Sequence, residues 1–68
     1  MDIVTTIKQL ALDQNMSINQ LCDNVGLSPQ NMVQKFRRNS LYYTDVIKLL
    51  DGLGYQFQII QKNNLEIL

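Results

Sequence analysis

A short segment near the middle of the chain carries hydrogen-bonding and cationic side chains but no acidic residue. Its three amides and three cations are Gln30, Asn31, Gln34, Lys35, Arg37 and Arg38. A carboxamide can form a bidentate pair of hydrogen bonds with adenine, and cationic side chains neutralise phosphates. The alternative is that the amides are merely solvated and that the cations complement a helix dipole. Because no acid lies between Gly26 and Thr44, the segment favours phosphate contact.

A helix just before this segment is predicted from its capping residues. Ser17 can cap a helix over residues 18–25, and Gln20 lies at the third helical position, where it completes a capping box. Leu21 and Cys22 then begin an apolar stripe that the helix would bury. The sequence therefore predicts a short, well-defined helix here.

The cationic segment itself is predicted to be a second helix. Gly26 follows the first helix at the position where a left-handed residue commonly ends it. Ser28 can cap the next helix, over residues 29–38, and Pro29 suits its first position because an N–H is not needed there. Two helices joined by such a turn form a helix-turn-helix.

Two further helices are expected on either side. Residues 2–15 carry apolar side chains at helical spacing, and Asn15 marks the end of that helix. A fourth helix is expected from a cap at Thr44 to Gly54. The apolar residues expected to pack together are Ile3, Ile7, Leu10, Ala11, Leu21, Cys22, Met32, Phe36, Val46, Ile47, Leu49, Leu50 and Leu53.

The last part of the chain changes from helical to alternating periodicity. Apolar and polar residues alternate from Tyr55 to Ile59, which predicts a half-buried β-strand. Asn63 and Asn64 suit a hairpin turn, and residues 65–68 can return as a second strand. A lone strand or hairpin is barely stable in water, so we expect it to pair with a second subunit. The alternative is that it folds back on its own helices. The residues expected to form a dimer interface are Tyr55, Phe57, Ile59 and Ile60.

Composition limits the classes of function. The chain has 68 residues, 46% of them hydrophobic, which is enough for one small packed domain. Six cations balance six acids, whereas nucleic-acid-binding proteins are usually basic. The chain has no histidine and its acids are scattered, so we expect no catalytic residues, no metal, no cofactor and no enzymatic activity. With one cysteine, no long apolar run and no signal-peptide pattern, a cytoplasmic protein without a membrane partner is expected.

Residues 3–54, roughly three-quarters of the chain, resemble the lambda-repressor-like helix-turn-helix family, also called the Cro or XRE type. The resemblance rests on two stretches, MSINQLCDNVGLSPQNM and DVIKLLDGLGY. It implies a mostly α, four-helix domain over residues 1–54, followed by a C-terminal β-strand or hairpin over residues 55–68. Two features depart from the family. The segment from Phe36 to Asn39 lacks the usual acidic residue and glycine, and Pro29 replaces a residue that often reads bases.

The resemblance also implies a binding mode for each polar residue. The helix over residues 29–38 would lie in the major groove of double-stranded DNA. The base contacts would come from Gln30, Asn31 and Gln34. The phosphate contacts would come from Ser17, Ser28, Lys35, Arg37, Arg38, Asn39 and Ser40.

Two functions are consistent with these observations. The first is a small homodimeric, sequence-specific transcriptional regulator, expected to be a repressor, which binds half-sites about 34 Å apart. The second is an antitoxin-like or accessory module that binds another protein and has weak or no DNA binding. The acid-free segment and its amides favour the first function, whereas the neutral net charge and Pro29 favour the second.

Overall fold

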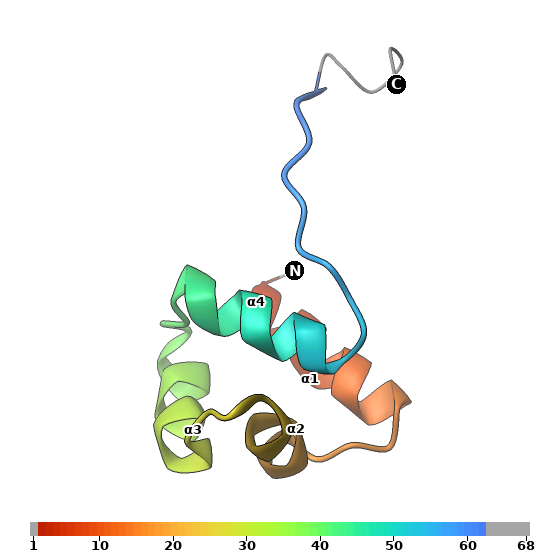
Figure 1. The fold of residues 1–68 in the computed structure, drawn as a ribbon. Coiled ribbons are helices and arrows are strands. Elements are labelled where there is room, and N and C mark those ends of the chain that lie inside the picture. Colours follow the sequence, from red (N-terminus) through yellow and green to blue (C-terminus); the bar gives the residue numbers. More distant parts are fainter. Residues whose placement is uncertain (1, 63–68) are drawn as a thin grey trace.

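The described part of the chain folds as four helices joined by short turns. A computed structural model describes residues 2–62. The helices are α1 (Ile3–Asp13), α2 (Ile18–Val25), α3 (Pro29–Arg38) and α4 (Tyr43–Gly52). Helix α2 packs against each of the other three, and α1 also packs against α4 (Figure 1). The mostly α, four-helix architecture is therefore confirmed.

The caps of α2 and α3 and the turn between these helices have the predicted geometry. The Gln20 N–H donates to Ser17 Oγ at 3.1 Å, and the Ser17 N–H donates to Gln20 Oε1 at 2.9 Å, which completes the capping box. Gly26 adopts φ +76°, the left-handed conformation that favours glycine. The Asn31 N–H donates to Ser28 Oγ at 3.4 Å, and Pro29 occupies the first position of α3. Local side chains therefore fix where α3 begins.

All four helices contribute to a single hydrophobic core. Its buried residues are Val4, Ile7, Ala11, Leu21, Cys22, Met32, Phe36, Val46, Leu49, Leu50 and Leu53. Burial raises the pKa of the Cys22 thiol, as expected for a cysteine that acts as a small apolar residue. Helix α4 approaches α2 closely at Gly52, where a Cβ atom would lie 2.5 Å from Val25 Cγ1.

Helix α4 differs in two ways from the sequence-based expectation. It begins at Tyr43 rather than after a Thr44 cap, because the Asp45 carboxylate accepts the Tyr42 N–H at 3.0 Å. Ile47 was expected in the core but is 37% exposed. The helix thus starts two residues earlier than expected, and the Ile47 side chain faces solvent.

The predicted C-terminal strand is not present in the part of the chain that the structure describes. Residues 55–60 form an extended segment that is not part of a sheet and runs away from the helices (Figure 1). No strand is found elsewhere among residues 2–62, so within the described residues the alternating segment has no sheet edge beside it. Tyr43 and Phe57 nevertheless meet edge to face, with ring centroids 5.6 Å apart. The expected turn at residues 63–64 and the second strand at 65–68 lie outside the described residues.

Membrane-spanning helices are not found among residues 2–62. The longest helix there, α1, has 11 residues, fewer than a bilayer requires.

Candidate nucleic-acid interface

Helix α3 separates an apolar inner face from a polar outer face. Met32 and Phe36 are buried against the core, one helical turn apart. The residues of α3 that are exposed and polar are Gln30, Asn31, Gln34, Arg37 and Arg38. The structure thus brings together all three amides predicted as base contacts and two of the predicted phosphate contacts. Asn39 ends the helix at φ +52°, and it and Ser40 are also exposed.

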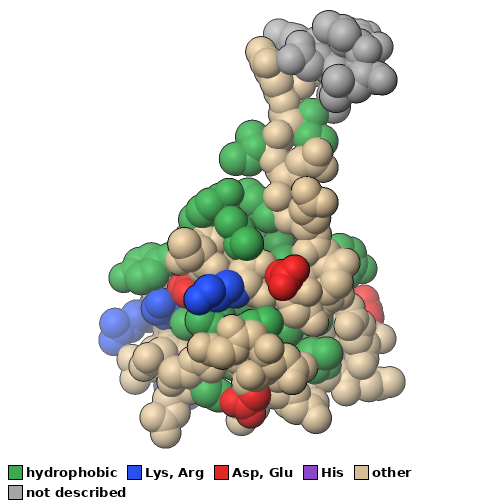
Figure 2. All heavy atoms as spheres, in the orientation of Figure 1, with side chains coloured by type: hydrophobic (Ala, Val, Ile, Leu, Met, Phe, Trp, Pro, Cys, Tyr) green, Lys and Arg blue, Asp and Glu red, His purple; other side chains and the backbone are tan. Residues whose placement is uncertain are grey.

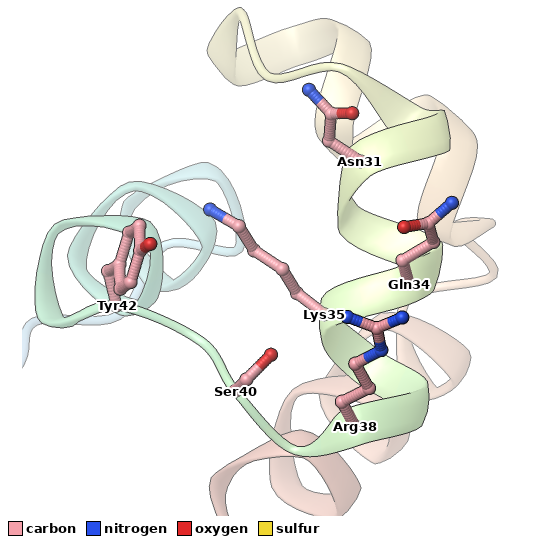
Figure 3. Close-up of a pocket in the computed structure, with 6 residues that line it drawn as sticks. All are labelled: Asn31, Gln34, Lys35, Arg38, Ser40 and Tyr42. Atoms are coloured by element: carbon pink, nitrogen blue, oxygen red, sulfur yellow. The ribbon is translucent and has the colours of Figure 1, made fainter.

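A polar hollow lies on one side of α3, towards the N-terminus of α4. It is lined by Asn31, Gln34, Lys35, Arg38, Ser40 and Tyr42. Figure 3 shows that these side chains come from α3 and from the turn that follows it, with the Lys35 side chain crossing towards Tyr42. The hollow therefore combines amides, a hydroxyl and cations, groups that suit the edge of a base or a phosphate.

Lys35 has a partner within the domain. Its Nζ lies 2.9 Å from Asp45 Oδ2 and 4.1 Å from the centroid of the Tyr42 ring. The Lys35 side chain is 26% exposed and that of Asp45 is 9% exposed. Lys35 is thus the one candidate contact of the sequence-based set that is not fully exposed.

A second groove lies on the opposite flank of α3, beside α1 and the start of α2. It is lined by Lys8, Ile18, Val33, Phe36 and Arg37. Lys8 Nζ lies 5.9 Å from the centroid of the Phe36 ring, and Val33 is 39% exposed. The walls are apolar and both charged groups are cationic, so this flank also suits an anionic partner.

The two serines have established structural partners. The Ser17 and Ser28 hydroxyls both accept backbone N–H groups at helix N-termini. The backbone N–H of Ser17, which a phosphate contact would use, already donates to Gln20 Oε1. Both side chains are exposed, but their observed role is to cap α2 and α3.

Cations gather on the α3 side of the molecule, while acids are scattered. Figure 2 shows several Lys and Arg side chains near one another, with acidic side chains mostly single. Arg37 and Arg38 form no ion pair with any described residue, in contrast to Lys35. A chain with zero net charge can therefore present local positive charge at the end of α3.

Three residues that line the grooves beside α3 or pair with its cations were not predicted from the sequence. Lys8 belongs to α1, and the position of Val33 in an exposed groove depends on where α1 and α2 lie beside α3. Asp45 lies one residue beyond the acid-free window that ends at Thr44. An acid three positions after a helix cap is a known signal, but it becomes visible only once the cap is placed at Tyr42.

Comparison with protein-family models, curated protein sequences and solved structures finds no match to this chain.

Proposed function

We propose that the protein is a small, sequence-specific DNA-binding regulator of transcription, not an enzyme, which acts in the cytoplasm. In this proposal, the domain is a lambda-repressor-like helix-turn-helix and α3 lies in the major groove. The observation that carries it is the outer face of α3, where three exposed amides adjoin two arginines that lack an ion-pair partner among the described residues.

The proposed roles of the α3 residues in base and phosphate contact follow from the chemistry of their side chains. Gln30, Asn31 and Gln34 would read base edges, because carboxamides both donate and accept hydrogen bonds. Arg37 and Arg38 would neutralise phosphates, which supplies affinity and salt dependence without sequence information.

Selection from a random pool of duplex DNA at two salt concentrations tests this proposal directly. Enrichment of a two-fold symmetric sequence, with affinity that falls steeply as salt rises, is the expected result. Recovery of no preferred sequence would contradict a sequence-specific regulator.

Gln34 is expected to contribute to base discrimination. Gln34→Ala should weaken binding to the selected site by about 1–3 kcal/mol while leaving binding to random duplex nearly unchanged. Competition titrations with the two duplexes measure this difference. Gln9→Ala, which removes an exposed amide from α1, is the matched control and should change neither affinity.

We place the dimer contact of the regulator at the segment after α4. Tyr55, Phe57, Ile59 and Ile60 are all exposed in the single chain, and Figure 2 shows hydrophobic side chains near this segment. Such a patch on so small a domain is typical of an interface. Pairing between two copies of the segment as β-strands would provide the missing sheet edge.

Deleting residues 55–68 is expected to convert a dimer into a monomer. Sedimentation equilibrium of both proteins measures the change in mass. A dimer that survives the deletion would place the interface elsewhere.

The same exposed apolar segment favours a second candidate, a module whose main partner is another protein. In that case the random pool would yield no preferred DNA sequence, and a pull-down would be the next experiment.

A further inference from the structure

Asp45 joins three parts of the domain through one carboxylate oxygen. Its Oδ2 accepts a hydrogen bond from Lys35 Nζ of α3 at 2.9 Å and another from the Tyr42 N–H of the preceding turn at 3.0 Å. Asp45 itself lies in the first turn of α4 and is only 6% exposed. Lys35 Nζ also lies over the Tyr42 ring, 4.1 Å from its centroid. A single carboxylate thus links α3, the turn and α4.

This arrangement places the charge of Lys35 in an ion pair within the domain. A buried carboxylate is stable only when it is paired and hydrogen-bonded, and removing one partner is strongly unfavourable. For Lys35 to reach a DNA phosphate, it would have to leave Asp45 with the Tyr42 N–H alone. Arg38 lines the same hollow without an ion-pair partner among the described residues.

We propose that Asp45 and Lys35 are positioning residues, which hold the α3–α4 turn against α3 and keep Lys35 away from phosphate. Ser40 and Tyr42, which the turn contributes to the hollow, are thereby held in a fixed arrangement around the same hollow as Gln34 and Arg38. The hollow then has the charge of one free cation rather than two. This lowers binding to arbitrary duplex and so increases discrimination between sequences.

Removing the charge of Asp45 tests the inference. In Asp45→Asn, the freed Lys35 can reach a phosphate, so the salt slope of binding to random duplex should steepen by up to about 0.9 for each protomer. At 0.15 M salt, this corresponds to roughly fivefold tighter binding to random duplex, and the ratio of specific to non-specific affinity should fall.

Asp51→Asn is the matched control, since it removes the same charge from an exposed position on the same helix. Its salt slope should stay close to that of the wild-type protein. Equal slopes for Asp45→Asn and Asp51→Asn would overturn the inference.

Lys35 is tested separately by a neutral side chain of similar length. Lys35→Met should leave the salt slope unchanged, whereas Arg38→Met should reduce it by about 0.9 for each protomer. A fall of that size in Lys35→Met would show that Lys35 neutralises a phosphate, and would overturn the inference. Lys35→Met leaves the buried Asp45 carboxylate without its ion-pair partner. The double variant Lys35→Met with Asp45→Asn removes both charges and therefore provides a second test. Its slope should also equal that of the wild-type protein.

The expected changes in salt slope rest on the proposed function, whereas the positioning role of Asp45 can also be tested without DNA. Hydrogen exchange of the Tyr42 amide should accelerate by about tenfold in Asp45→Ala, because its acceptor is lost, and should stay unchanged in Asp51→Ala. If the wild-type protein binds no duplex, the proposed function fails and exchange alone decides the positioning role. An unchanged Tyr42 exchange rate in Asp45→Ala would overturn it.

Discussion

Replacing both Arg37 and Arg38 with methionine is expected to weaken binding to duplex DNA by roughly 30-fold for each protomer at 0.15 M salt. Both guanidinium groups are exposed at the end of α3 and lack an ion-pair partner among the described residues. Each lost phosphate contact should reduce the salt slope by about 0.9, so the slope should fall by about 1.8 for a protomer and 3.6 for a dimer. In a dimer, the affinity loss would approach a thousandfold. Titrations at several salt concentrations measure both quantities.

The matched control removes two cations from other parts of the chain. Lys48→Met combined with Lys62→Met changes the net charge by the same amount, but affects α4 and the segment that follows it. Its salt slope should differ little from that of the wild-type protein. A similar loss in the two double variants would mean that binding follows net charge and not the surface of α3. An unchanged slope in the arginine variant would remove the main support for DNA binding.

The sequence predicts best those features that depend on residues close together in the chain. The capping box at Ser17, the left-handed Gly26 and the cap at Ser28 each involve groups within four residues of one another, and all are found in the structure. The apolar residues Met32 and Phe36 lie one turn apart and set which face of α3 meets the core, so the outward position of Gln30, Asn31 and Gln34 follows from the sequence pattern as well.

Features that depend on the relative placement of helices were not predictable in the same way. The contact between Lys35 and Asp45 requires the α3–α4 turn to bring together groups ten residues apart. The sequence pattern shows three cations without an acid, whereas the folded chain shows that one of the three is already paired. The exposure of Ile47 likewise depends on which side of α4 meets α1 and α2.

The alternating segment after Gly54 shows a different limit. Its pattern fits a strand, but a strand requires a neighbouring edge to which its backbone can hydrogen-bond. Among residues 2–62 no other strand lies beside residues 55–60, which form an extended segment. The alternating pattern therefore predicts only a preference for extended backbone, and the formation of a sheet depends on a neighbouring strand.

Leu49→Ala is expected to cause a large loss of stability. Leu49 is fully buried in α4, which packs against both α1 and α2. Truncating such a side chain typically costs about 2–5 kcal/mol, because the surrounding helices relax only partly into the cavity. A domain of this size has only about 3–10 kcal/mol of stability to lose. We therefore expect the melting temperature to fall by roughly 10 °C or more, as measured by circular dichroism at a fixed protein concentration.

Leu12→Ala provides the matched control, because Leu12 is 66% exposed on α1 and the same atoms are removed. Its stability should change by no more than about 0.5 kcal/mol. Equal losses in the two variants would contradict the burial of Leu49 in the core.

Leu49→Ala and the arginine double variant together separate a loss of folding from a loss of DNA binding. Helix α4 carries Asp45 against Lys35, so Leu49→Ala should lose DNA affinity only as it unfolds, whereas the arginine variant should lose affinity while it remains folded. Measuring unfolding and DNA binding on the same samples therefore distinguishes a residue that supports α3 from one that contacts phosphate.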